Sequence, residues 1–187
     1  IVNLGVYEHH VVPVFRETVK PGMHVLDIGA NIGVYAVAAG LNGAHVTAID
    51  ISGGLVEVAR DRAPSGLDID WRVGDMLDPA LGQFDHVVAM DSLIHYETGD
   101  IVDVLTALGA RSPSIAFTFA PRTPLLAAMH ATGKLFPKSD RAPAIVPVAE
   151  AKLTRLLAQR LPSHGIAASE RIVSGFYTSH AMLVARG

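Results

Sequence analysis

The chain has 187 residues, of which 50% are hydrophobic, so it is long and apolar enough to bury the core of one domain. Its formal net charge of −3 argues against a general nucleic-acid binder, and the lack of cysteine excludes disulfides, thiolate metal ligands and cysteine nucleophiles. No apolar run reaches the roughly 18 residues of a membrane-spanning helix and no signal-peptide pattern opens the chain, so we expect a cytoplasmic protein.

Strand and helix patterns alternate along the chain. Apolar runs predict strands over residues 23–29, 44–50, 67–75, 86–92 and 114–121, and a final antiparallel pair over 166–176 and 177–187. Periodic patterns predict helices over residues 34–43, 54–64, 99–110 and 148–162. The alternation predicts an α/β, Rossmann-like fold in a single domain over residues 1–187, with a seven-stranded, mostly parallel sheet and an antiparallel C-terminal strand pair.

The first predicted strand ends in VLDIGANIG, which carries Asp27, Gly29 and Gly33. In open parallel sheets, ligands bind at the carboxyl ends of the strands, where the strand order reverses. Glycines there would let the backbone approach a ligand with no Cβ in the way. We expect Asp27 to point at that crevice, where a carboxylate suits an ammonium or hydroxyl group better than a phosphate. The spacing fits neither the dinucleotide fingerprint nor a P-loop, which disfavours a nicotinamide oxidoreductase.

Two further acidic residues follow the next two predicted strands. Asp50 ends the second strand, where a carboxylate can accept hydrogen bonds from ribose hydroxyls, and Asp75 follows the third, where it can take an adenine amino group. Each aspartate alone could be a turn residue or a helix cap. Three acids at the ends of three successive strands indicate a nucleoside with an amino-acid tail and no phosphates, which fits S-adenosylmethionine (SAM).

These motifs, D-x-G-x-x-x-G, an acid after the second strand and G-D-x after the third, resemble those of class I SAM-dependent methyltransferases. A closer resemblance covers about residues 44–187, where AHVTAIDIS, VAMDSLIHYETGDI, FTFAPRTPLLAAMHATGKLFPKSDRAPAIVPV and RIVSGFYTSHAMLV are similar to the magnesium-protoporphyrin IX methyltransferase family of chlorophyll and bacteriochlorophyll biosynthesis. About residues 1–40, with YEHHVVPVFRETVKPGMHVLDIGANIGVYAVAAG, instead resemble FkbM-type methyltransferases. We therefore predict a join of two relatives near residues 40–44, natural or engineered.

The resemblance implies SAM-dependent O-methylation of one propionate carboxylate of magnesium-protoporphyrin IX, giving the monomethyl ester. It implies an active-site role for His95, which could orient the propionate or act as an acid–base group; a capping or packing histidine is the alternative. We expect Tyr96, the next residue, to contact the substrate. Asp91 could border the cofactor or cap a helix. We assign cofactor binding to Asp27, Gly29, Asn31, Gly33, Asp50, Ile51, Asp75, Met76 and Asp91.

The one irregular region runs from residue 121 to 147 and combines cations with apolar residues. An apolar wall with cations at its edge suits a flat macrocycle that bears two carboxylates. We therefore expect a substrate-covering insertion over residues 121–147, with Arg122, Lys138 and Arg141 contacting the substrate. Solvated surface charge is the alternative for each cation alone.

Two other functions fit the sequence. The N-terminal third hints at a methyltransferase for another small acid or sugar, and the predicted join would also suit a non-catalytic SAM- or porphyrin-binding scaffold. We expect no metal site. Association with the membrane surface and transfer of the porphyrin from magnesium chelatase stay open.

Overall fold

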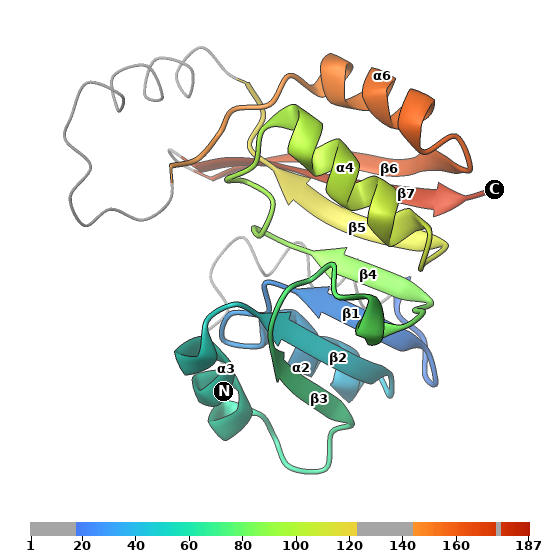
Figure 1. Cartoon of the computed structure of the whole chain (residues 1–187). Helices are drawn as coiled ribbons and strands as arrows, with labels where there is room; N and C mark the ends of the chain where they lie inside the picture. The colour runs from blue at the N-terminus through green and yellow to red at the C-terminus, as the bar shows by residue number, and fades with distance from the viewer. Residues whose placement is uncertain (1–17, 123–143, 175–176) are drawn as a thin grey trace.

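The computed structural model describes residues 18–122, 144–174 and 177–187, and the account of the fold is confined to them. They form one seven-stranded sheet in the order β3-β2-β1-β4-β5-β7-β6, with helices packed against it (Figure 1). The pairs β1–β2, β1–β4, β2–β3 and β4–β5 are parallel, whereas β5–β7 and β6–β7 are antiparallel. The predicted mostly parallel sheet with an antiparallel C-terminal strand pair is confirmed.

Each strand and helix predicted within the described residues is present, with small differences at the ends. The strands are β1 (His24–Ile28), β2 (His45–Asp50), β3 (Ile69–Val73), β4 (His86–Ala89), β5 (Ser114–Phe119), β6 (His164–Ser174) and β7 (Tyr177–Arg186). The helices are α2 (Val34–Leu41), α3 (Gly53–Arg62), α4 (Thr98–Gly109) and α6 (Glu150–Arg160), with a short 3-10 turn, η1 (Pro79–Leu81). The prediction for β4 was too long, because the chain leaves extended geometry at Asp91, where φ is +54°.

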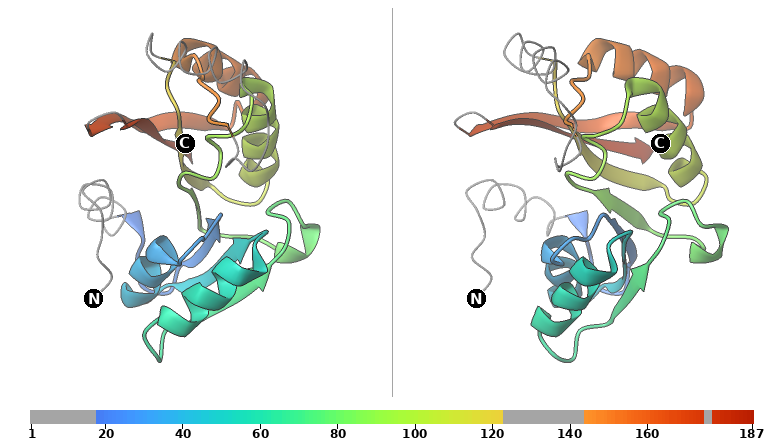
Figure 2. Two further views of the ribbon diagram at one scale, coloured as in Figure 1. Left: turned by 90° about the vertical axis from the view of Figure 1, so that its left-hand side faces the viewer. Right: turned by 60° about the vertical axis from the view of Figure 1, so that its left-hand side comes forward.

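Two hydrophobic cores cover the two faces of the sheet. Leu26 belongs to the core that contains the buried residues of α4 and α6, whereas its neighbour Val25 belongs to the core beneath α2. Successive side chains of a strand point to opposite faces, so β1 contributes to both cores. Figure 2 shows α4 and α6 side by side on the same face of the sheet. Because β1 and β4 are buried on both faces, only their ends are available for a site.

Candidate active site

The strand order reverses between β1 and β4. From β1 the chain proceeds outward through β2 to β3, and from β4 it proceeds the other way to β5. The loops that follow β1 and β4 therefore leave their strands in opposite directions, and the residues between them border the crevice where open α/β sheets bind ligands. The acidic residues singled out in the sequence lie on or just after strands at this carboxyl edge.

The glycine loop after β1 adopts left-handed backbone geometry at three positions, Gly29 (φ +66°), Asn31 (φ +49°) and Gly33 (φ +84°). We expected the missing Cβ atoms to open space for a ligand, but protein occupies their places. A Cβ on Gly29 would lie 2.6 Å from the Cβ of Ser92, and one on Gly33 would lie 2.5 Å from the ring of Trp71. The glycines thus permit the backbone conformation and let the loop pack against Trp71 of β3 and against Ser92 in the loop after β4.

We expected Asp27 to point at the crevice. It is instead buried, with 2% of its surface exposed. Its carboxylate accepts a hydrogen bond from the backbone N–H of Ala36 in the first turn of α2. Burial is the largest cause of a raised pKa for Asp27, which lies at about 7. The hydrogen bond from Ala36 lowers the pKa, and the nearby charge of Asp50 raises it further. The Oδ2 atom of Asp27 is buried and has no hydrogen-bond partner among the described residues. A cation close to this carboxyl would therefore favour its ionised form.

Asp50, at the end of β2, holds the glycine loop in place. One carboxylate oxygen accepts a hydrogen bond from the backbone N–H of Asn31 at 3.0 Å, and the other accepts one from Ser52 at 2.8 Å. A carboxylate has about four acceptor positions, so these two bonds leave room for hydroxyl donors from a ligand.

Two apolar side chains are exposed beside Asp50. Ile51 is 86% exposed directly after β2, and Val73, which pairs with Asp50 across the sheet, is 59% exposed at the end of β3. Together these two side chains give the edge an apolar surface that a flat, apolar part of a ligand can contact. Val73 was not singled out from the sequence, where it looks like any other residue of an apolar strand.

Asp75 and Met76 follow β3 in a tight turn. Asp75 Oδ1 accepts a hydrogen bond from the backbone N–H of Leu77 at 2.9 Å, which is the turn role considered as the alternative for this residue. Met76 is partly buried and packs against the core on the α4 and α6 face. The turn therefore connects the core to the edge on which Asp50 lies.

Asp91 follows β4 and does not cap a helix, since α4 begins at Thr98 with Glu97 at its N-cap. Its backbone N–H donates to Thr118 Oγ1 at 2.7 Å, and the Thr118 hydroxyl donates back to Asp91 Oδ1 at 3.1 Å. Thr118 lies in β5 and is fully buried. Nothing in the sequence marks Thr118, because a threonine in an apolar strand is common.

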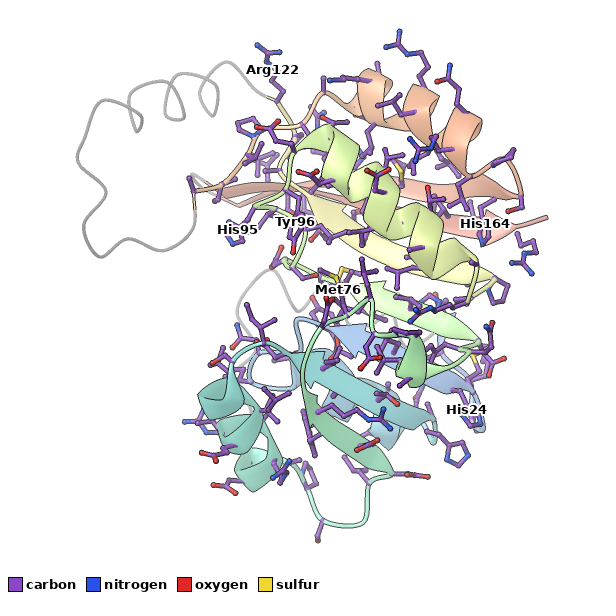
Figure 3. The ribbon with its side chains drawn as sticks, viewed as in Figure 1. His24, Met76, His95, Tyr96, Arg122 and His164 are labelled. Carbon is purple, nitrogen blue, oxygen red and sulfur yellow. The ribbon has the colours of Figure 1, made fainter. Side chains whose placement is uncertain are left out.

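His95 and Tyr96 lie side by side at the left-hand side of the molecule in Figure 3. His95 Nδ1 lies 3.2 Å from the backbone oxygen of Ala144, and a hydrogen bond there needs the proton on Nδ1, which leaves Nε2 as an acceptor. The neighbouring Ile94 accepts a hydrogen bond from the N–H of Val146 at 2.9 Å. Tyr96 packs in part against the core. The loop after β4 is thus paired with the chain that leads into α6.

Of the three basic residues expected to contact the substrate, the structure describes only Arg122. Arg122 is exposed, and Figure 3 shows its side chain pointing away from His95 and Tyr96. Lys138 and Arg141, with most of the expected insertion over residues 121–147, lie outside the described residues.

The two ends of that expected insertion meet. Pro121 and Val148 form a bridge, and the N–H of Arg122 donates to the oxygen of Val148 at 2.8 Å. The chain therefore departs from and returns to the carboxyl end of β5, next to the loop that carries His95.

A family model for a methyltransferase domain matches residues 25–110, which include the glycine loop, Asp50 and the whole loop after β4. With the seven-stranded sheet, this match defines the chain as a methyltransferase domain. A second family model, for the C-terminus of magnesium-protoporphyrin IX methyltransferase, matches residues 89–186. The chain belongs to the magnesium-protoporphyrin IX methyltransferase family.

Individual relatives agree with the family match. The chain is 46% identical over 164 residues to a magnesium-protoporphyrin O-methyltransferase of Rhodobacter capsulatus, covering 86% of this chain and 71% of that protein. It is 30% identical over 141 residues to the chloroplastic magnesium protoporphyrin IX methyltransferase of Arabidopsis thaliana, covering 73% of this chain and 45% of that protein. The chain thus spans less than half the length of the plant relative.

A solved structure is similar over nearly the whole chain. The magnesium protoporphyrin IX methyltransferase from Synechocystis PCC 6803, crystallised with S-adenosylhomocysteine (SAH), superposes with a TM-score of 0.81 at 25% identity, covering 97% of this chain and 82% of that one. The family expected from the sequence is confirmed. The Rhodobacter match covers a larger share of the chain than residues 44–187 alone, so it includes part of residues 1–43. The join near residues 40–44 stays a prediction.

No helix within residues 18–122, 144–174 and 177–187 is long and apolar enough to cross a membrane. In the same part of the chain, no group of three or more His, Cys, Asp or Glu residues could hold a metal ion.

Proposed function

We propose that the protein transfers the methyl group of SAM to a propionate carboxylate of magnesium-protoporphyrin IX, forming the monomethyl ester. The observation that carries this proposal is the 46% identity, over 86% of the chain, to an enzyme named for that methyl transfer. The match includes the strand ends that carry Asp50 and Asp91 in the structure.

The residues at the carboxyl edge fit the parts of SAM. Asp50 would accept hydrogen bonds from the ribose hydroxyls, and the exposed side chains of Ile51 and Val73 would contact the two-ring base. Asp75 and Met76 would border the far side of the base. The backbone from Gly29 to Gly33 would carry the amino-acid tail, whose ammonium group would favour ionisation of Asp27. SAM supplies an electrophilic methyl group on a sulfonium sulfur.

The reaction needs alignment more than acid–base help. A propionate is already ionised at neutral pH, because an ordinary carboxyl pKa is near 4. In the transfer, a carboxylate oxygen forms a bond to the methyl carbon as the bond from that carbon to sulfur breaks, so SAH and the methyl ester are the products and no proton moves. The protein's contribution is to hold the carboxylate in line with the methyl group and to exclude water.

His95 is the residue we propose to hold the propionate. The proposal requires the doubly protonated ring, which would donate from Nδ1 to the oxygen of Ala144 and from Nε2 to the propionate carboxylate. Tyr96, beside it, would contact the macrocycle. Arg122, Lys138 and Arg141 remain proposed contacts for the second propionate, of which the structure describes only Arg122.

The test is transfer of label from the methyl group of SAM to magnesium-protoporphyrin IX. Label that mild alkali releases as methanol identifies an ester, whereas label stable to alkali would contradict carboxyl methylation. His95→Ala should lower turnover at least tenfold and leave the affinity for SAH, measured by calorimetry, within about twofold of the wild type. A loss of SAH affinity in that variant would place His95 with the cofactor instead.

Two partners belong to the same proposal. Magnesium chelatase would supply the porphyrin, and a cytoplasmic protein that handles so apolar a substrate would associate with the membrane surface. Flotation with lipid vesicles tests the association with the membrane surface. We expect the protein to float with the vesicles; a protein that stays at the bottom of the gradient with and without porphyrin would contradict it.

A further inference from the structure

Two residues other than glycine adopt left-handed backbone geometry in the described part of the chain. They are Asn31 (φ +49°) and Asp91 (φ +54°). Asparagine and aspartate adopt this conformation more readily than other residues with a Cβ, but it is still less favourable than ordinary geometry. Surrounding contacts hold such residues in place, and they cluster at functional sites. Asn31 follows β1 and Asp91 follows β4, so the two lie on the two sides of the point where strand order reverses.

Each of these residues is held by a side chain from the next strand outward. Asp50 of β2 accepts a hydrogen bond from the N–H of Asn31 at 3.0 Å. Thr118 of β5 accepts one from the N–H of Asp91 at 2.7 Å and returns one to Asp91 Oδ1 at 3.1 Å. The same backbone strain is thus fixed in the same way on both sides, although only Asp50 was expected from the sequence to belong to the site.

The bond to Thr118 fixes more than Asp91. The next residue, Ser92, packs closely on Gly29: a Cβ added to Gly29 would lie 2.6 Å from the Cβ of Ser92. Leu93 after it is fully buried, and His95 follows. A change in the backbone at Asp91 would therefore move Ser92 against the glycine loop and redirect the chain that carries His95. Thr118 is fully buried, so water cannot replace its hydroxyl without rearrangement.

We propose that Thr118 is a positioning residue for methyl transfer. Its hydroxyl holds the strained backbone at Asp91, and through it the contact between Ser92 and the glycine loop and the place of His95. This role rests on the proposed function, because it matters only if these two loops bind SAM and the substrate. Thr118 itself touches neither.

The test compares Thr118→Val, which keeps the shape and removes both hydrogen bonds, with Thr118→Ser, which keeps the hydroxyl. Thr106→Val is the control, since its hydroxyl donates to the oxygen of Val102 within α4, away from the loops. Hydrogen exchange of peptides covering residues 90–96, SAH affinity by calorimetry and turnover are measured on all three and on the wild type. Thermal unfolding shows whether each variant is folded.

We expect Thr118→Val to speed exchange over residues 90–96, weaken SAH binding about tenfold and lower turnover more than that. Its melting temperature should fall by only a few degrees, about what the loss of these hydrogen bonds costs, so that the variant stays folded at the assay temperature. Thr118→Ser should stay within about twofold of the wild type, as should Thr106→Val. Should Thr118→Val fail to fold, Thr118→Ala removes the same hydroxyl without adding a methyl group against Asp91.

Three results would overturn the inference. Unchanged exchange in Thr118→Val means that the hydroxyl does not hold Asp91. Faster exchange with unchanged SAH affinity and turnover means that the held conformation has no part in function. Equal losses in the valine and serine variants would indicate a packing role. A wild-type protein that binds no SAH would instead overturn the proposed function, and the exchange data would still report on the hydrogen bond.

Discussion

Asp27 has the least ordinary environment of the acidic residues in the site. It is buried under the first turn of α2, close to Asp50, and burial raises its pKa from 3.8 to about 7. A carboxyl whose pKa is raised by folding binds its proton more tightly in the folded than in the unfolded state. Stability from this group is therefore greatest at low pH, declines as pH rises from about 4 to 7, and is level above that.

We predict that Asp27→Asn raises the melting temperature above that of the wild type by about 4 °C or more at pH 8, with a difference that shrinks toward pH 5. The amide cannot ionise, so it avoids the cost of a buried charge, and its oxygen can still accept from Ala36. Burial also lowers the pKa of His86 and His180, but their effect on the pH dependence of stability is the same in the wild type and in Asp27→Asn, so it cancels in the difference. Asp61→Asn, at an exposed position, is the control. A difference that does not vary with pH would contradict this account of Asp27.

Gly29 allows a direct measurement of how tightly the two loops pack. Gly29→Ala adds a Cβ that must lie near Ser92 at a φ of +66°, and we predict a loss of about 2–4 kcal/mol in the free energy of unfolding by denaturant. Gly66→Ala has a similar φ of +85° and no atom within 4 Å of the new Cβ, so it measures the backbone cost alone. Equal losses in the two variants would show that Ser92 moves aside freely.

At the scale of strands and helices, the sequence was informative because period and composition determine these elements. Runs such as HVLDI and HVTAID are buried strands in the structure, and the small-residue pattern after Gly33 is a helix. The candidate site was predictable only in part. Asp50 was visible because it ends a strand, whereas Thr118 and Val73 matter through neighbours distant in sequence, which no local pattern reports.

The packing of α6 offers a prediction at this scale. Leu153 is fully buried in the core that α6 shares with α4, although α6 carries mostly polar residues on its outer face. Leu153→Ala should reduce the free energy of unfolding by about 2–5 kcal/mol, because it removes buried apolar surface and leaves a cavity. Leu41→Ala, at a position that is 57% exposed, should change it by less than about 1 kcal/mol. A small effect at Leu153 would mean that α6 is not anchored by this core.

On the scale of the whole molecule, the fold brings the proposed site residues to one edge of the sheet. The sheet brings Asp50 and the glycine loop to one side of the reversal point and Asp91 and His95 to the other. Under the proposed function, a cofactor that lies along the glycine loop and is bordered by Asp91 would meet a carboxylate substrate near His95, between the loops. The sequence alone supported this arrangement through the family resemblance, but the contacts that fix the two loops are visible only in three dimensions.

The central claim is methylation of a porphyrin propionate, and the most direct measurement is chromatography of the product. The protein is incubated with SAM and magnesium-protoporphyrin IX, and the porphyrins are separated and identified by mass. We predict a single new species heavier by one methylene group, the monomethyl ester, that is absent without SAM and strongly reduced with His95→Ala. A folded protein that binds SAH yet leaves the porphyrin unchanged would contradict the claim.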